Sequence, residues 1–178
     1  LFSNIFLFKY NRILLSIMIS FTYVGTSNHC ENDSKIGKSS NLYSRENSLE
    51  CSYSRFAFLF RILIICSCDD EALNIEEYLH KKNWEHSTTR FPTSEGGTEW
   101  FDKRFTKEEI EQQLSEGGYT NDVIDDPALI NAYIEPLKRE YEQRKQEYIQ
   151  KMNSTLKPNT LTMRPYQLAE HIINWFTT

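Results

Sequence analysis

The sequence lacks several features that define common catalytic and membrane-bound classes. Its 178 residues include only six glycines and five prolines. No run reaches the roughly 20 consecutive apolar residues that a transmembrane helix needs. No G-x-x-x-x-G-K-[ST] loop is present to cradle a nucleotide phosphate. These absences argue against a membrane span and against a P-loop ATPase site in this chain.

Basic charge is also scarce. The chain has 20 Lys and Arg against 25 Asp and Glu, a net charge of −5. Residues 1–68 contain seven basic and four acidic side chains, whereas residues 69–178 contain 13 and 21. The only basic cluster is interleaved with glutamates, at Lys138, Arg139, Arg144 and Lys145. Because a broad nucleic-acid footprint needs clustered positive charge, the charge pattern predicts no nucleic-acid partner.

The four cysteines do not form a metal-binding pattern. One set of residues follows the order C-x-C-x11-H-x5-H and so approaches a zinc finger: Cys66, Cys68, His80 and His86. A single residue between the cysteines makes too tight a loop for the usual thiolate pair. We therefore expect no metal site and no cofactor, and spacing alone supports no catalytic triad. The disulfide state of Cys30, Cys51, Cys66 and Cys68 stays open.

The clearest element is a helix from Asp126 to Met152. Asp126 and Pro127 form a helix start, since the carboxylate can cap a free amide and proline suits the first position. Pro136 removes a backbone hydrogen bond inside this helix and predicts a kink or break near Ile134–Pro136. Apolar side chains recur at steps of three, four and seven, at Ile130, Ile134, Leu137, Tyr141, Tyr148 and Met152. The sequence thus predicts a Pro-kinked amphipathic helix.

This helix supplies the predicted partner surface. The candidate partner-binding residues are Tyr133, Ile134, Leu137, Tyr141, Tyr148 and Met152. Two interpretations stay open: a docking or coiled-coil helix, and an ordinary amphipathic helix that packs on its own domain. From this surface we predict a non-catalytic helical protein-interaction or assembly module with a protein partner.

Three more helices are predicted in the second part of the chain. The first spans Glu71–Lys82 after Asp69 and Asp70. The second spans Lys107–Glu116, opened by a Thr106–Glu109 capping box and closed by two glycines. The third spans Pro165–Phe176. Residues 69–178 are therefore predicted to form an α-helical domain, a small bundle that includes the long kinked helix.

The N-terminal third carries weaker signals. Residues 1–27 place Lys9 and Arg12 before a short apolar run, a pattern typical of a signal peptide or signal anchor, and residues 1–24 could then reach a membrane. A buried helix and a translation of non-coding sequence are the alternatives. Residues 28–68 are predicted to be a linker and an apolar segment, Phe56–Cys66, without regular period. If residues 1–27 are a signal peptide or signal anchor, the protein is secretory or membrane-associated. If residues 1–68 are not native protein sequence, the protein is intracellular.

The predicted fold class is therefore mainly α, with a poorly structured N-terminal third before a helical bundle. Near its end the chain carries Met163–Trp175 (MRPYQLAEHIINW), in which Arg164, Tyr166 and Gln167 match an Arg-x-Tyr-Gln start. This segment resembles the Q-motif region of superfamily 2 helicases and chromatin remodelers. The resemblance implies an adenine nucleotide contact at these three residues and, as an alternative function, an upstream piece of a helicase-like ATPase.

Overall fold

The computed structural model describes residues 19–28, 30–52, 57–88 and 99–155. The chain divides into two compact units, Leu1–Glu135 and Pro136–Thr178. The first unit contains a β-sheet with its covering helices and the first turns of the helix α5 (Pro127–Thr155). Within the described residues, the second unit consists of the remainder of α5. The candidate functional residues described below all lie in the first unit.

The first unit is built on a six-stranded antiparallel sheet in the order β4-β5-β2-β1-β3-β6. Its three long strands are neighbours at the centre, and its edge strands are two residues long. The strands are β1 (Ser20–Ser27), β2 (Cys30–Ser39), β3 (Phe58–Cys66), β4 (Ser87–Thr88), β5 (Trp100–Phe101) and β6 (Val123–Ile124). Strand β1 therefore has a long partner on each side.

Side chains of β1 alternate between the two faces of the sheet. Phe21 and Tyr23 belong to the hydrophobic cluster on one face, and Val24 belongs to the cluster on the other. Thr22 also points to the second face, where its hydroxyl donates to the carbonyl of Ala72 at 2.8 Å. Every residue of β1 is buried because helices cover both faces. The strand is therefore part of the core on both of its sides.

Strand β3 carries a β-bulge at Arg61. Val24 pairs with Ile62, but the next residue of β1, Gly25, pairs with Phe60. Arg61 is the extra residue, and its side chain is exposed. An extra residue reverses the face on which the following side chains lie. Phe58 and Phe60 thus join one hydrophobic cluster, although Ile62 lies two residues later in the other.

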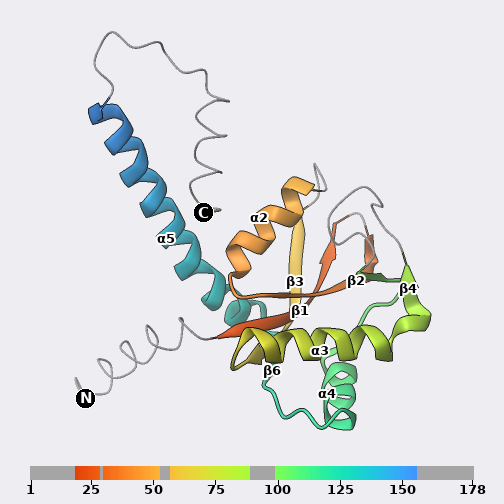
Figure 1. The fold of residues 1–178 in the computed structure, drawn as a ribbon. Helices are drawn as coiled ribbons and strands as arrows, with labels where there is room; N and C mark the ends of the chain where they lie inside the picture. Colours follow the sequence, from red (N-terminus) through yellow and green to blue (C-terminus); the bar gives the residue numbers. More distant parts are fainter. Residues whose placement is uncertain (1–18, 29, 53–56, 89–98, 156–178) are drawn as a thin grey trace. The chain divides into compact units, whose positions relative to one another are not determined.

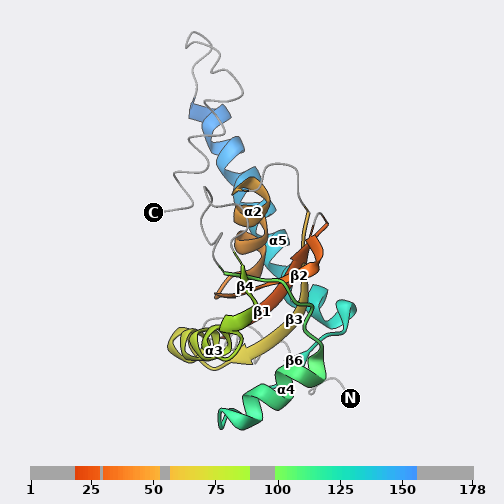
Figure 2. The same ribbon diagram turned by 90° about the vertical axis from the view of Figure 1, so that its right-hand side faces the viewer.

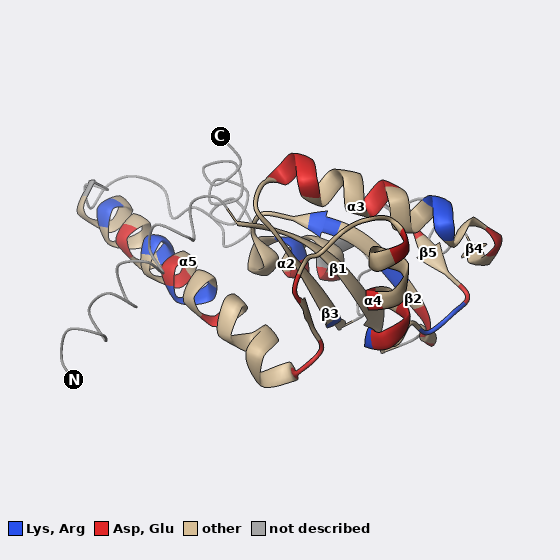
Figure 3. Cartoon of the chain, turned by 90° about the horizontal axis from the view of Figure 1, so that it is seen from below, with Lys and Arg blue, Asp and Glu red and all other residues tan. Residues whose placement is uncertain are grey.

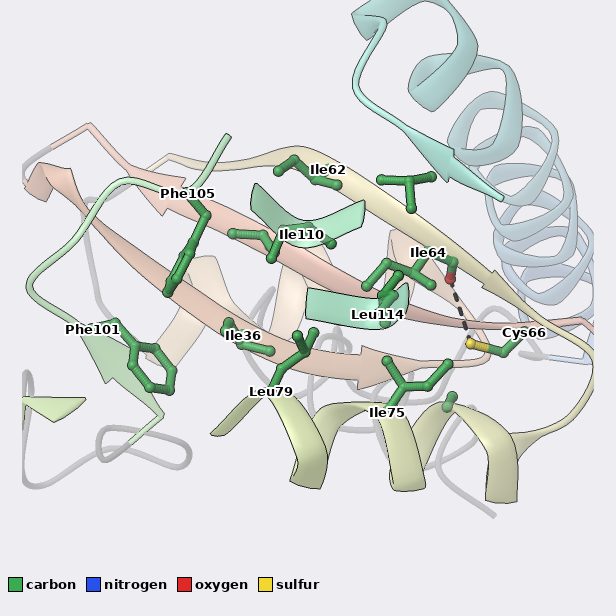
Figure 4. Close-up of a cluster of buried hydrophobic side chains, with 13 residues drawn as sticks. Ile36, Ile62, Ile64, Cys66, Ile75, Leu79, Phe101, Phe105, Ile110 and Leu114 are labelled. Atoms are coloured by element: carbon green, nitrogen blue, oxygen red, sulfur yellow. Dashed lines mark hydrogen bonds between the residues drawn. The ribbon is translucent and has the colours of Figure 1, made fainter. Parts of the chain in front are cut away.

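Helices cover the sheet on both faces (Figures 1 and 2). On one face, α3 (Asp69–Lys82) and α4 (Lys107–Glu116) place Ile75, Leu79, Ile110 and Leu114 against the strands. Figure 4 shows these side chains directed at Ile36, Ile62 and Ile64. On the other face, α2 (Leu42–Ser52) and the first turns of α5 contribute Leu42, Leu49, Ile130 and Ile134. Each buried leucine or isoleucine stabilises the fold by roughly 2–5 kcal/mol relative to alanine.

Three of the helices expected from the sequence are present. The predicted Glu71–Lys82 helix is α3, and the predicted Lys107–Glu116 helix is α4. The capping box at Thr106 is present in both directions, and Gly118 follows α4 with φ 78°. Asp126 caps α5 by accepting from Ala128 N at 2.8 Å. The long helix is thus confirmed, although it continues through Pro136 without interruption. The predicted helix at Pro165–Phe176 lies outside the described residues.

The mainly α fold class, however, is wrong, and so is the description of the protein as α-helical or coiled coil. A six-stranded antiparallel sheet forms the centre of the first unit. The N-terminal third is not poorly structured: residues 20–27 and 30–39 are central strands, and residues 42–52 are helical. Strands covered on both faces lose the alternation of polar and apolar residues that marks a strand. The first 18 residues lie outside the described part of the chain.

Candidate functional site

Gly37 allows Tyr23 to lie across β2. The two residues are direct partners in the β1–β2 ladder. A Cβ atom on Gly37 would lie 2.4 Å from Tyr23 Oη and 2.6 Å from Cζ, so any larger residue would displace the ring. Phe58 and Phe60 hold the ring edge-on, with centroids 5.9 and 5.1 Å away. The phenol is fully buried and its hydroxyl is fixed in direction.

Arg45 of α2 binds the hydroxyl of Tyr23. The helix is positioned by Leu42 and Leu49, which are buried, and it starts at Asn41, whose Oδ1 accepts from Ser44 N at 2.9 Å. Arg45 lies one turn after Leu42 on the same side and therefore faces the sheet. Its Nε donates to Tyr23 Oη at 2.9 Å. The guanidinium side chain remains 24% exposed, so an incoming ligand can reach it.

Lys35 and Glu99 form an ion pair next to this contact. Lys35 Nζ donates to Glu99 Oε2, and the lysine side chain is fully buried. Glu99 immediately precedes β5, and its carbonyl accepts from Ile36 N at 3.2 Å. Arg45 Nη2 approaches the same Glu99 oxygen at 4.0 Å. Because both contacts use Oε2, Oε1 of Glu99 has no protein partner among the described residues.

These four residues lie around the pairing of β5 with β2. Strand β5 pairs with Ser34 and Lys35 only. Beyond Ile36, no strand in the described residues covers this edge of β2. Glu99 therefore stands at the start of β5, opposite Ile36 of β2. We call Tyr23, Lys35, Arg45 and Glu99 the β2-edge site.

Burial sets the protonation of the phenol and the ammonium. It raises the pKa of Tyr23 well above the ordinary value, and Arg45 only partly opposes the shift. Tyr23 is therefore a neutral phenol near pH 7, accepting from Arg45 and keeping its own proton to donate. Burial lowers the pKa of the Lys35 ammonium, and Glu99 opposes this shift by stabilising the charged form. The site thus combines a hydrogen-bond donor with two cations.

Two further titratable side chains approach from α3. His80 Nε2 lies 3.1 Å from the carbonyl oxygen of Ile36 and donates to it, and burial lowers the pKa of the imidazole. His80 is therefore neutral near pH 7. Glu76, one turn earlier, is half-buried. Burial, followed by the negative charge of Glu99, raises the pKa of Glu76 from 4.5 to about 7.

The raised pKa of Glu76 predicts a pH-dependent stability. Since its pKa is about 7 in the folded protein and 4.5 for an unperturbed glutamate side chain, folding is progressively disfavoured as pH rises between these values. Glu76→Gln should therefore raise the melting temperature at about pH 8 and leave it unchanged at about pH 4. Thermal unfolding at both pH values measures the effect. Glu77→Gln, at the exposed next position, should show no pH-dependent difference. An equal effect of Glu76→Gln at both pH values would contradict the assignment.

A preformed multidentate metal centre is not found. Among the described residues, no three or more His, Cys, Asp or Glu side chains gather around one point. The β2-edge site offers a single carboxylate, with Oε1 of Glu99 available. Mg²⁺ often binds proteins through one or two carboxylates and completes its shell with water and substrate phosphate. The donor set therefore fits a cation that arrives with a phosphate ligand.

The cysteines in the described residues are thiols. Cys30, Cys66 and Cys68 form no disulfide, and the side chain of Cys51 lies outside the described residues. His80 is committed to Ile36, and His86 Nδ1 lies 3.2 Å from Asp102 Oδ1. The prediction of no zinc finger stays untested beyond these contacts.

Among the described helices, none has both the length and the apolar character to cross a membrane.

The predicted partner-binding residues separate into two groups. Tyr133 packs edge-on against Phe21 at 5.3 Å, and Ile134 is buried in the same cluster, so both belong to the core of the first unit. In the second unit, four half-buried side chains lie along α5, at Leu137, Tyr141, Tyr148 and Met152. Their docking role stays a prediction. The adenine-binding residues Arg164, Tyr166 and Gln167 lie outside the described residues.

Sequence reasoning missed every residue of the β2-edge site. The available signals were the alternating segment Phe21–Val24 and two short motifs, Tyr23-Val-Gly25 and Lys35-Ile-Gly37. In each motif the glycine sits where an aromatic ring crosses the strand: Gly25 accommodates Phe58, and Gly37 accommodates Tyr23. Two neighbouring strands with this pattern would have indicated a hairpin with an aromatic ring over each glycine.

The comparison with known proteins identifies the family. The T5orf172 domain matches residues 20–116, which is more than half of the chain. The chain belongs to the T5orf172 domain family. The matched segment extends from the start of β1 to the end of α4 and includes the complete β2-edge site. No curated protein and no solved structure matches the chain. The T5orf172 domain thus comprises most of the sheet, while α5 follows it.

Proposed function

We propose that the T5orf172 domain hydrolyses phosphodiesters at the β2-edge site, with a divalent cation on Glu99. One observation carries the proposal: a buried ammonium and a guanidinium meet at one carboxylate, and the guanidinium is held by a buried phenol. Tyr23 is tied to Arg45, and Glu99 receives both Lys35 and Arg45. Such sets of fixed cations and donors suit reactions that build negative charge on phosphoryl oxygens.

The local charge favours an anionic substrate. Among the described residues, the β2-edge site joins the guanidinium of Arg45 to the Lys35–Glu99 ion pair. The neighbouring Lys38 is already paired with Asp69 at 2.5 Å. An excess positive charge in a partly buried site attracts an anion strongly, although the chain as a whole is acidic. In Figure 3, the positions of Asp and Glu residues are red along α3 and α4.

Arg45 is the group best suited to the phosphate itself. A planar guanidinium can donate two parallel hydrogen bonds to phosphate oxygens. Its Nε is held by Tyr23 Oη, which fixes the plane of the group and directs the terminal nitrogens toward Glu99. In this geometry Arg45 would neutralise the charge that develops on the phosphoryl oxygens as water attacks.

Tyr23 and Glu99 would have separate roles. Tyr23 keeps its proton near pH 7 and can donate it in a hydrogen bond to the substrate. Glu99 would hold a divalent cation, which would supply Lewis-acid polarisation of the phosphoryl group. In the reaction, water forms a P–O bond, the ester P–O bond breaks, and the alcohol leaves with the proton that water releases. Lys35 holds Glu99 in place throughout.

Hydrolysis of a phosphodiester requires contacts with the substrate only at the β2-edge site. The charge pattern still predicts no broad nucleic-acid surface, but a diester needs to reach only the β2-edge site. Two probes separate the chemistry from nucleic-acid binding: bis(4-nitrophenyl) phosphate as a small diester, and supercoiled plasmid DNA as a polymer. A domain that cleaves both would use the site on nucleic acid, and a domain that cleaves only the first would act on smaller diesters.

The test uses the full chain with Mg²⁺ or Mn²⁺ and with EDTA. The wild type should hydrolyse at least one probe in a metal-dependent manner, and Glu99→Gln should be slower by about 100-fold or more. Glu116→Gln is the matched control, because Glu116 also pairs with a lysine, Lys82 at 2.9 Å, but lies on α4. No hydrolysis by the wild type, or equal rates for the two variants, would contradict the proposal.

A further inference from the structure

The side chain of His80 joins α3 to the place where β5 begins beside β2. His80 is half-buried and lies at the border of the buried face of α3, next to Leu79. Its Nε2 lies 3.1 Å from the carbonyl oxygen of Ile36 in β2. Its ring packs against the ring of Phe101 in β5, with the centroids 5.3 Å apart. One side chain of α3 therefore contacts both strands that meet at the β2-edge site.

The hydrogen bond from His80 takes the place of a bond in the strand ladder. In a hydrogen-bonded antiparallel pair, the two opposed residues exchange both of their N–H···O bonds. Ile36 and Glu99 form only one such bond, in which Ile36 N donates to Glu99 O at 3.2 Å. Among the described residues, no bond returns from Glu99 N to the Ile36 carbonyl, which accepts from the imidazole. The regular pairing of β5, with Ser34 and Lys35, thus ends next to the His80 contact.

The acceptor determines which nitrogen of His80 carries the hydrogen. A carbonyl oxygen can only accept a hydrogen bond, so the contact with Ile36 requires the hydrogen on Nε2. Near pH 7 the imidazole is neutral and has one ring hydrogen, which leaves the lone pair on Nδ1. The contact therefore selects one of the two tautomers of His80.

Neighbouring residues of β2 hold Glu99 at two points. The backbone carbonyl of Glu99 accepts from Ile36 N, and its carboxylate accepts from Lys35 Nζ. Both contacts depend on the position of the same two residues of β2. His80 binds one of these residues from α3, and it binds there through the backbone. A displacement of Ile36 would therefore move both groups that hold Glu99.

We propose that His80 is a positioning residue of the β2-edge site, which fixes Ile36 and, through it, the carboxylate of Glu99. The proposal deepens the phosphodiesterase function and rests on it for its catalytic consequence. Hydrogen-bonding side chains behind a metal ligand typically contribute about 10- to 100-fold to metal affinity or activity. Without the donor of His80, Glu99 is held less firmly and should bind a divalent cation more weakly.

The first measurement needs no substrate and uses the full chain. In the wild type, the ring ¹⁵N resonances of His80 should show the hydrogen on Nε2, and a hydrogen on Nδ1 would overturn the proposal. His80→Phe keeps a ring beside Phe101 but has no donor, so the Ile36 amide should exchange with solvent about tenfold faster. His80→Gln supplies a side-chain N–H and should exchange near the wild-type rate. Equal exchange in the wild type and His80→Phe would also overturn the proposal.

The second measurement is the Mn²⁺ dependence of diester hydrolysis. His80→Phe should need about 10- to 100-fold more Mn²⁺ for its half-maximal rate, and His80→Gln should recover most of this loss. His86→Phe is the matched control, because His86 Nδ1 also makes one contact, to Asp102 Oδ1 at 3.2 Å, but on the exposed surface. It should leave the Mn²⁺ dependence unchanged. An unchanged dependence in His80→Phe, or a loss in His80→Gln equal to that in His80→Phe, would overturn the proposal.

Failure of the positioning role and failure of the proposed function give different results. Absent hydrolysis by the wild type contradicts the proposed function, while the ring resonances and the exchange of the Ile36 amide still test the positioning by His80. Hydrolysis by the wild type with the same Mn²⁺ dependence in His80→Phe contradicts only the positioning role. The wild-type resonances decide even if His80→Phe does not fold.

Discussion

Arg45→Ala is expected to lower the rate of diester hydrolysis by about 100- to 1000-fold, the effect typical of removing one preorganised charge-stabilising donor. The reason is the position of the guanidinium, between Tyr23 Oη at 2.9 Å and Glu99 Oε2 at 4.0 Å. The loss should appear mainly in kcat, because the developing charge is greatest in the transition state. Initial rates at saturating diester measure it.

Stability should fall by about 1–3 kcal/mol in this variant, because the buried Tyr23 hydroxyl loses its partner. Helix α2 should stay folded, since Leu42 and Leu49 anchor it. Arg45→Lys should restore only part of the rate, since an ammonium cannot donate in a planar pair. Arg144→Ala is the matched control, because Arg144 pairs with Glu140 on the exposed surface of α5. Hydrolysis by Arg45→Ala at the wild-type rate would exclude Arg45 from the chemistry.

Gly37→Ala is expected to disturb both folding and hydrolysis. A Cβ atom at this position would lie 2.4 Å from Tyr23 Oη, and the ring cannot retreat because Phe58 and Phe60 enclose it. Overpacking of this kind costs about 1–3 kcal/mol. The hydroxyl should also lose its contact with Arg45, so the rate should fall even in the folded fraction. Urea denaturation and initial rates measure the two effects separately.

A second substitution separates the two effects of Gly37→Ala. Adding Tyr23→Phe removes the clashing hydroxyl and should recover part of the lost stability. The rate should not recover, because Arg45 then has no phenol to hold it. Gly25→Ala provides a comparison, since its Cβ would instead meet the ring of Phe58 at 2.2 Å. If Gly37→Ala were as stable and active as the wild type, Tyr23 would not lie across β2 as described.

Helices α3, α4 and α5 could be predicted from the sequence because their signals are local, whereas α2 was predicted to be part of a linker. The Thr106–Glu109 capping box and the Asp126–Pro127 start each lie within a few residues, and both were confirmed. The strands could not, since their signals depend on the sheet. Strand β2 is polar along much of its length, yet Asp33, Ser34 and Lys35 are buried. The hydrogen-bond and ion-pair partners of these buried polar groups lie on neighbouring elements. No pattern within the strand's own sequence therefore indicates that these residues are buried.

The β2-edge site could not be predicted from the sequence for a related reason. Its residues come from four separate parts of the chain, and Glu99 is 64 residues from Lys35. By residue type Lys35 is also expected at the surface, because lysines are almost never fully buried unless paired. Arg61 interrupts an apolar run in the sequence, and only the pairing of β1 with β3 identifies it as the extra residue of a β-bulge. The predicted docking residue Ile134 proved to be a core residue.

The central claim is that Tyr23 and Arg45 act as one unit in phosphodiester hydrolysis. A double-mutant cycle of initial rates tests it most directly, with the wild type, Tyr23→Phe, Arg45→Ala and the double variant. Tyr78→Phe serves as the control, since its hydroxyl also makes one hydrogen bond, to Gln113 O at 2.9 Å, away from the site. We expect the double variant to be about as slow as the slower single variant. Rates that fall by the product of the two single effects, or that do not fall in Tyr23→Phe, would contradict the account.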